Sequence, residues 1–119
     1  MRLSWLLVAL ALASVLASLQ HYALANFLYW HYPWFDTFMH FLGGTAVASF
    51  CIALLDRRRA LVFLGGMFGI AAGWELFELG LNAEREANFV FDTSLDLLMD
   101  AVGMTAAYLA ARFTIWRSA

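Results

Sequence analysis

The chain has 119 residues, of which 64% are hydrophobic and only 13% are charged, and its formal net charge is −2. Soluble domains usually carry about 25% charged residues, so this composition excludes an ordinary soluble domain and indicates a membrane protein. We expect membrane lipids among its partners and no nucleic acid.

Four long apolar segments follow one another along the chain. They cover about residues 3–19, 37–55, 60–80 and 93–111. Each is close to the roughly 20 residues that a helix needs to cross about 30 Å of hydrocarbon. The connections are short, which favours antiparallel neighbours. We therefore predict an all-α fold, in which one domain forms a four-helix transmembrane bundle.

The first segment also has features of a secretory signal peptide. Arg2 precedes an apolar core, and small residues surround Ala17 and Ser18. Apolar and aromatic residues continue from Tyr22 to Trp30, however, which favours a first span that leads into an interfacial segment. Whether residues 1–17 are cleaved stays open. The next helix is expected to begin after Pro33.

Orientation follows from the arginines, because the chain contains no lysine. Arg2 precedes the first span, residues 57–59 are all arginine, and Arg112 and Arg117 follow the fourth span. The positive-inside rule then predicts that both termini and residues 57–59 lie in the cytoplasm. The tryptophans agree with this orientation. Trp5 and Trp116 would lie at the inner interface, and the outer interface would carry Trp30, Trp34 and Trp74.

Glycines in the spans predict places where helices meet closely. The third span carries a stripe of three at four-residue intervals: Gly65, Gly69 and Gly73. Such stripes let two helix backbones approach each other in a membrane, so we expect close packing there. Gly43 and Gly44 follow His40, and Gly103 follows Asp100. For these three glycines, close packing and room for a ligand are both open.

Six acidic residues lie inside the apolar segments or at their ends. They are Asp36, Glu75, Glu78, Asp92, Asp96 and Asp100. A carboxylate near the bilayer centre costs roughly 2.5–3.5 kcal/mol on insertion scales, so such residues are rare and usually functional. With the predicted orientation, all six and His40 fall in one layer of the outer leaflet. Spacings of three or four residues place the polar residues of each helix on one face.

Six carboxylates cannot all stay ionised close together in a low dielectric, so either several are protonated or a cation compensates them. The spans contain no lysine or arginine that could pair with them, and Arg85 is the only such candidate from the predicted outer loops. We therefore predict a divalent cation, with Mg²⁺, Mn²⁺, Ca²⁺ and Zn²⁺ as candidates. The candidate ligands are Asp36, His40, Glu75, Glu78, Asp96 and Asp100. His40 or Glu75 is the candidate catalytic base.

Simpler roles are open for each of these side chains. Asp36 and Asp92 could serve only as helix N-caps. His40 could be a neutral hydrogen-bonding residue between helices. Glu75, Asp96 and Asp100 lie a turn or more inside their spans and could be purely structural.

Three motifs carry a resemblance to a known family. Asp36-Thr-Phe-Met-His40-Phe-Leu-Gly43-Gly44, Trp74-Glu75-Leu-Phe-Glu78 and Asp92-Thr-Ser-Leu-Asp96-Leu-Leu-Met-Asp100-Ala-Val-Gly103 resemble the motifs of YjdF-like inner-membrane proteins. The first is also similar to the opening motif of VanZ-like proteins. VanZ-like proteins more often have asparagine at the position of Asp100 and glutamine at that of Glu78, which favours the YjdF-like side. The resemblance implies a small multi-pass protein of the bacterial inner (cytoplasmic) membrane. VanZ-like members are associated with glycopeptide resistance, but the resemblance names no reaction.

The leading hypothesis is a divalent-cation site in the outer leaflet that binds or acts on a phosphate-bearing lipid or envelope precursor, such as a phospholipid or a polyprenyl phosphate. One alternative is a proton or cation transporter, because membrane acids and histidines also form relays. The acids stop in the outer half of the spans, so transport would need a moving bundle or an assembly such as a homo-oligomer. Another alternative is a non-catalytic accessory subunit. Whether the protein is an enzyme stays open.

Overall fold

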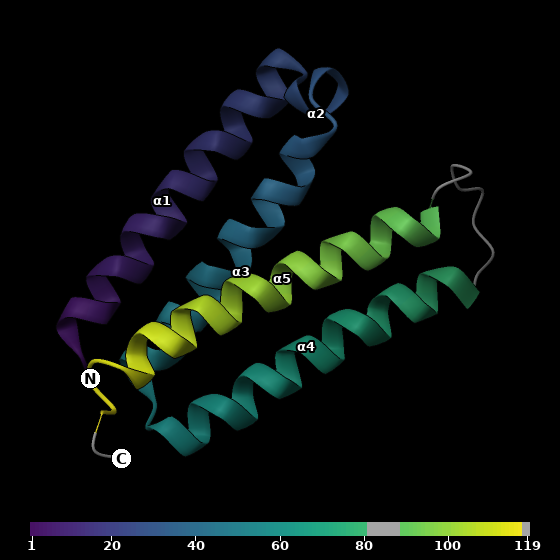
Figure 1. The fold of residues 1–119 in the computed structure, drawn as a ribbon. Coiled ribbons are helices and arrows are strands. Elements are labelled where there is room, and N and C mark those ends of the chain that lie inside the picture. The colour runs from purple at the N-terminus through teal and green to yellow at the C-terminus, as the bar shows by residue number, and fades with distance from the viewer. Residues whose placement is uncertain (81–88, 118–119) are drawn as a thin grey trace.

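The computed structural model describes residues 1–80 and 89–117 of the chain. Within these ranges, the side chains of residues 74–75, 78–80 and 89–93 are not described. The described residues form helices and contain no strand, which confirms the predicted all-α class (Figure 1). In chain order, the helices are α1 (Leu3–Asn26), α2 (Leu28–His31), α3 (Trp34–Leu54), α4 (Arg57–Gly80) and α5 (Phe89–Arg112).

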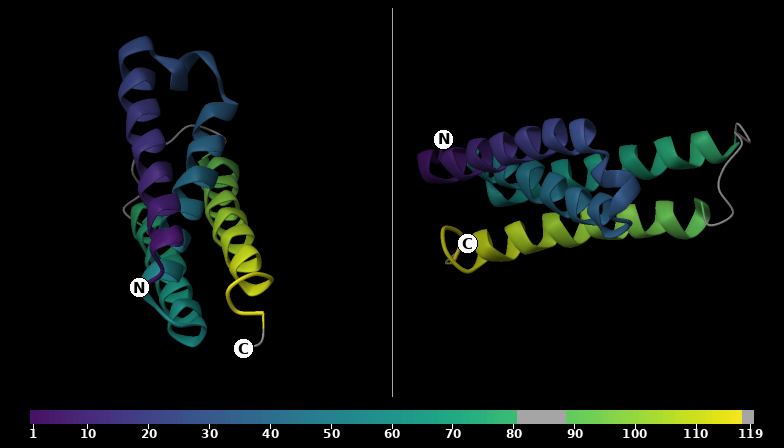
Figure 2. Two further views of the ribbon diagram at one scale, coloured as in Figure 1. Left: turned by 90° about the vertical axis from the view of Figure 1, so that its left-hand side faces the viewer. Right: turned by 90° about the horizontal axis from the view of Figure 1, so that it is seen from above.

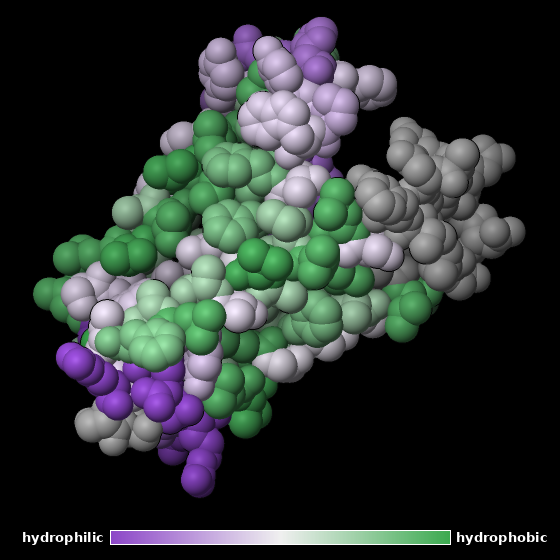
Figure 3. All heavy atoms as spheres, viewed as in Figure 1, coloured by the Kyte–Doolittle hydropathy of each residue, from purple (hydrophilic) through white to green (hydrophobic). Residues whose placement is uncertain are grey.

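Three helices of the described part are long and apolar enough to cross a membrane. They are α1, α3 and the segment Ser94–Arg112 of α5. Their length and composition indicate a membrane protein, and Figure 3 shows an apolar band between two more hydrophilic ends. The side chains of α4 are described continuously only to Gly73, so the third predicted span, residues 60–80, stays a prediction. The predicted count of four helices omitted the short helix α2.

The turn between α1 and α3 has its own local structure. Helix α1 continues past Leu19 to Asn26 and ends at Phe27, which has a left-handed backbone with φ 56°. A left-handed residue is a common way to end a helix, although phenylalanine is an unusual choice for it. Pro33 directly precedes α3, as expected for a residue whose φ already suits a helix start. The Tyr29 ring packs edge-on against Phe35, with ring centroids 5.0 Å apart, and this contact holds α2 on α3.

Helix α3 lies at the centre of the arrangement. It runs antiparallel to α1 and packs along α5 on its other side, while α4 makes much smaller contacts with α3 and α5 (Figures 1 and 2). The hairpins α1–α3 and α4–α5 meet near the two termini and diverge toward the opposite end. The larger buried cluster lies where they meet and is built around Ala48, Ile52, Leu64 and Trp116.

The end where the hairpins meet is rich in arginine, and we refer to it as the arginine end (residues 2, 57–59, 112 and 117). Nη1 of Arg2 donates hydrogen bonds to the carbonyl oxygens of Ile52, at 2.8 Å, and Leu55, at 2.7 Å. The last carbonyls of a helix lack partners within the helix, so Arg2 caps α3. The guanidinium also lies 5.3 Å from the centroid of the Trp116 ring. One side chain therefore links α1, α3 and the segment after α5.

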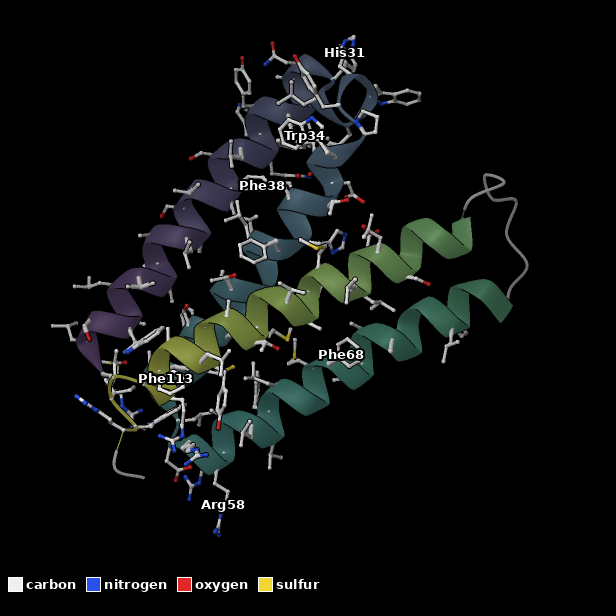
Figure 4. All side chains as sticks on the ribbon, in the orientation of Figure 1. His31, Trp34, Phe38, Arg58, Phe68 and Phe113 are labelled. Atoms are coloured by element: carbon white, nitrogen blue, oxygen red, sulfur yellow. The ribbon has the colours of Figure 1, made fainter. Side chains whose placement is uncertain are left out.

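The opposite end carries aromatic and polar residues of α2 and the start of α3, which include His31 and Trp34. Figure 4 shows these two residues far from Arg58 and Phe113 at the arginine end. This separation agrees with the charge pattern behind the predicted orientation. The side of the membrane that each end faces stays a prediction.

Close backbone packing occurs between α3 and α5, at glycines different from those of the predicted stripe. A Cβ atom added to Gly44 would lie 2.3 Å from the carbonyl oxygen of Asp100, and one added to Gly103 would lie 2.3 Å from that of Phe41. Only glycine permits this approach at either position. The prediction of close packing at Gly65, Gly69 and Gly73 is wrong, because no described atom comes within 4 Å of a Cβ placed there. Helix α4 stands back from its neighbours along that face.

Candidate metal centre

A cluster of one histidine and three aspartates forms where α3 and α5 lie closest. Asp36 and His40 are one turn apart on α3, and Asp96 and Asp100 are one turn apart on α5. Residues four apart lie on the same face of a helix, so each helix presents two polar side chains. The contact of Gly44 with the backbone of Asp100 brings the two pairs together. The cluster therefore depends on the glycines that let α3 and α5 touch.

His40 is the centre of this cluster. Its Nδ1 lies 3.1 Å from Oδ1 of Asp100, and because a carboxylate can only accept, Nδ1–H is the donor. Its Nε2 faces the other two carboxylates, at 3.7 Å from Oδ1 of Asp36 and 3.5 Å from Oδ2 of Asp96. The Asp96 side chain is largely buried, with 13% of its surface exposed, whereas that of Asp36 is 40% exposed. The Nε2 edge of the ring is thus directed toward a partly enclosed space between two helices.

The donor atoms at this edge have spacings suitable for a metal ion. One ligand atom each from Asp36, His40 and Asp96 lie within 4.8 Å of one another. Ligand atoms bound to a common ion at about 2.0–2.2 Å are about 3–3.5 Å apart at right or tetrahedral angles. The distances from Nε2 of His40 to the oxygens of Asp96, 3.5 Å, and Asp36, 3.7 Å, are close to that range. Asp100 has a different role, because its carboxylate accepts a hydrogen bond from the other ring nitrogen, Nδ1. Carboxylates commonly orient metal-bound histidines in this way.

Two residues for which an N-cap role was open have other positions. Asp36 is the third residue of α3, which Pro33 precedes, and α3 has no side-chain capping bond. An acid in the first turn still interacts favourably with the helix dipole. Asp92 lies inside α5, which begins at Phe89, and its side chain is not described. Neither Asp36 nor Asp92 is therefore a helix N-cap, which removes this alternative role.

The structure does not test two of the candidate ligands. Glu75 and Glu78 lie in the last turns of α4, and their side chains are outside the described part. Their contribution to the site, including that of Glu75 as a base, stays a prediction. The described site therefore comes from two helices instead of the expected three.

A cavity of about 410 Å³ adjoins the cluster on the side of α1 and α2. Its lining includes Asp36, His40 and Asp100 together with Gln20 and Tyr29. The Tyr29 hydroxyl donates a hydrogen bond to Oε1 of Gln20. Burial, and secondly the charge of Asp36, raises the pKa of Tyr29, so its phenol stays protonated at neutral pH.

Sequence reasoning missed Gln20 and Tyr29 as residues beside the site. The available signal was weak: Gln20 is a polar residue that ends an apolar run, and Tyr29 belongs to an aromatic segment. Only the reversal of the chain at Phe27 and Pro33 brings them next to Asp36.

Comparisons of the chain with protein-family models, curated proteins and solved structures find no match, so the resemblance to YjdF-like proteins stays a prediction.

Proposed function

We propose that this membrane protein binds a divalent cation through Asp36, His40 and Asp96, and uses the cation to bind and act on a phosphate-bearing lipid. One observation carries the proposal. The Nε2 edge of His40 faces carboxylates from two different helices, while Asp100 holds the opposite nitrogen. This arrangement supplies three donor atoms of the kinds that divalent cations take, and an oriented imidazole among them.

The donor set narrows the choice of cation and its role. Two carboxylates and one imidazole suit Zn²⁺ or Mn²⁺ better than Ca²⁺, which takes only oxygen ligands. Three protein ligands leave coordination positions open, as catalytic zinc sites do and structural zinc sites do not. An open position can hold a phosphate oxygen or a water molecule.

The charge of the site favours a cation that acts as a bridge. The described cluster contains three carboxylates and one imidazole, so an anionic phosphate would be repelled without a cation. A bound cation reverses the sign of this local field. The lipid phosphate would then complete the coordination.

The geometry also favours one of the two roles predicted for His40, metal ligand and general base. An imidazole nitrogen that coordinates a cation cannot accept a proton at the same time, and the other nitrogen already donates to Asp100. We therefore propose His40 as a ligand and not as a general base.

The transporter alternative has less support. Transport of protons or cations would need polar groups that continue from the cluster toward the arginine end. A larger cavity that extends from His40 in this direction has an almost wholly apolar lining among the described residues. We therefore do not propose transport.

Cation binding to purified protein tests the proposal. Wild-type protein stripped with a chelator should bind Zn²⁺ or Mn²⁺ at one site per chain, measured by calorimetry. Asp96→Asn should lower this affinity by more than about tenfold, since even outer residues of metal sites contribute about 10–100-fold. Asp56→Asn is the matched control, because Asp56 is an exposed acid next to Arg59 at the arginine end. Wild type that binds none of the four candidate cations would rule the proposal out.

A further inference from the structure

A second, larger cavity begins at the candidate metal centre. Its volume is about 770 Å³, and it extends along α3 from His40 to Leu54 and Leu55. Residues of α1, α4 and α5 also line it. It shares several lining residues with the smaller cavity beside the cluster: Ala13, Leu16, His40, Gly43 and Asp100. The His40–Asp100 pair therefore lies where the two cavities adjoin.

Small residues create this space. Ala9 and Ala13 of α1 and Gly43 and Ala46 of α3 all line the larger cavity, and no described atom lies within 4 Å of a Cβ placed on Gly43. The cavity is lined by both α1 and α4, but the backbones of these two helices do not come close to each other in the described part. The backbones of α1 and α4 therefore stand apart along the cavity, which gives a lipid chain a path between them.

The chemistry of the lining changes along its length. His40 and Asp100 supply its acid–base groups at one end, and apart from the Cys51 thiol the remaining lining side chains are hydrocarbon or thioether. An occupant that matches both parts has a polar head at the cluster and a hydrocarbon chain toward the arginine end. Because burial of apolar surface is favourable and burial of an unpartnered polar group is costly, the reverse orientation is excluded.

The length of the cavity also indicates how long the hydrocarbon chain of the occupant is. His40 and Leu54 are separated by 14 helical residues, which corresponds to about 21 Å along the axis of α3. One leaflet is about half of the 30 Å hydrocarbon core, or about 15 Å. A chain that fills the cavity from the cluster is therefore longer than a chain confined to one leaflet. A single elongated cavity also accommodates one chain more readily than two.

We infer that this cavity binds a lipid with one long hydrocarbon chain and a monophosphate head, the chemistry of a polyprenyl phosphate. The inference rests on the proposed function, because the phosphate is held by the cation at Asp36, His40 and Asp96. The chain lies over Gly43 and passes between Ala13 of α1 and Met67 of α4. The smaller cavity, with Gln20 and Tyr29, surrounds the head group.

Lipid binding to the whole protein in detergent, measured by native mass spectrometry, tests the inference. The probes are a long-chain polyprenyl monophosphate, the matching polyprenol without phosphate, and a diacyl phosphatidic acid. With Zn²⁺ or Mn²⁺ present, the polyprenyl monophosphate should bind at least about tenfold more tightly than either other lipid. A chelator should remove this preference, since the phosphate then faces uncompensated carboxylates.

Two variants on different helices, each of which fills part of the larger cavity, test whether the hydrocarbon chain of the lipid lies there. Gly43→Leu and Ala13→Phe should each weaken binding of the polyprenyl monophosphate by more than about tenfold without changing cation affinity, because they fill the cavity beside the ligands and not the ligand positions. Gly65→Leu is the control for the first, since its Cβ also meets no described atom and Gly65 does not line this cavity. Ala11→Phe is the control for the second, because Ala11 is exposed on α1 and lines neither cavity.

The outcomes separate the two proposals. Two results would overturn the inference about the bound lipid and leave the cation site in place. In the first, the wild type binds the cation but prefers phosphatidic acid. In the second, both obstructing variants bind the polyprenyl monophosphate as tightly as the wild type does. If the wild type binds no cation, the proposed function fails and the bridged lipid fails with it. Normal cation affinity in Gly43→Leu or Ala13→Phe shows that the variant is folded.

Discussion

Asp100 determines which nitrogen of His40 faces the other carboxylates. Its Oδ1 accepts from Nδ1 at 3.1 Å, which fixes the ring orientation and presents Nε2 to Asp36 and Asp96. Spacing along the chain places Asp100 on the same face as Asp96, so sequence reasoning treats the two acids alike. Their different places depend on the rotation of α5 about its axis, which the sequence spacing alone does not define.

This difference predicts a graded series of variants. Asp100→Asn keeps a hydrogen-bond acceptor but removes its charge, so the cation affinity should fall by about 10–100-fold, as for other residues that orient a metal-bound histidine. His40→Ala removes a ligand and should reduce binding more strongly. Calorimetric titration of both variants with the same cation measures the order. Equal loss in both variants would show that Asp100 is itself a ligand.

At the scale of the helices, the contact between α3 and α5 depends on one glycine from each. Gly44 and Gly103 have side-chain positions that are already occupied by backbone atoms of the opposite helix. The sequence shows many glycines in the spans, and the regular stripe at Gly65, Gly69 and Gly73 was the more prominent pattern. Glycine spacing indicates that a close contact is permitted but not which helix supplies the partner, and this explains why the prediction failed for α4.

A pair of alanine substitutions tests the contact. Gly44→Ala should destabilise the protein by about 1–3 kcal/mol, because its Cβ would force α3 and α5 apart. The matched change Gly65→Ala should leave stability unchanged or raise it by up to about 1 kcal/mol, since alanine favours a helix and meets open space there. Thermal unfolding in detergent compares the two. A smaller loss for Gly44→Ala than for Gly65→Ala would contradict the described contact.

Arg2 provides a second test between elements. Arg2→Ala removes two hydrogen bonds to carbonyls at the end of α3 and the contact with Trp116, so stability should fall by about 1.5–3 kcal/mol. Arg58→Ala is the control, because Arg58 is exposed and such changes usually stay within about 0.5 kcal/mol. Unfolding curves of the two variants under one detergent condition give the comparison. Equal stability would mean that Arg2 does not join the helices.

For the whole molecule, hydrophobicity was sufficient to predict the helical class and the general position of three of the four predicted spans. The start of α3 directly after Pro33 was also predicted, but the end of the first helix was not, since α1 continues past Leu19 to Asn26. Depth arguments placed Asp36, His40, Asp96 and Asp100 in one layer, and the structure brings these four residues together. The positions of Gln20 and Tyr29 depend on the reversal between α1 and α3, which is a tertiary feature.

Orientation in the membrane is testable with single cysteines. In a Cys51→Ala background, Trp30→Cys should react with a membrane-impermeant thiol reagent in intact cells, because Trp30 is 85% exposed at the end that is predicted to face outward. Arg58→Cys at the opposite end should react only after the membrane is permeabilised. Labelling of Arg58→Cys in intact cells would reverse the predicted orientation, and the proposed site would then face the cytoplasm.

The glycine contact between α3 and α5 also has a mechanical consequence. Because the two backbones touch at Gly44 and Gly103, this contact can serve as a pivot for a rotation of α3 against α5. His40 is one helical turn from Gly44, about 6 Å along the axis, whereas the start of α3 at Trp34 is about 15 Å away. Displacement grows with distance from a pivot. The separation of His40 from Asp100 therefore changes little. Asp36 is eight residues from Gly44, about 12 Å along the axis, so a wider opening between the hairpins at α2 draws Asp36 away from Asp96.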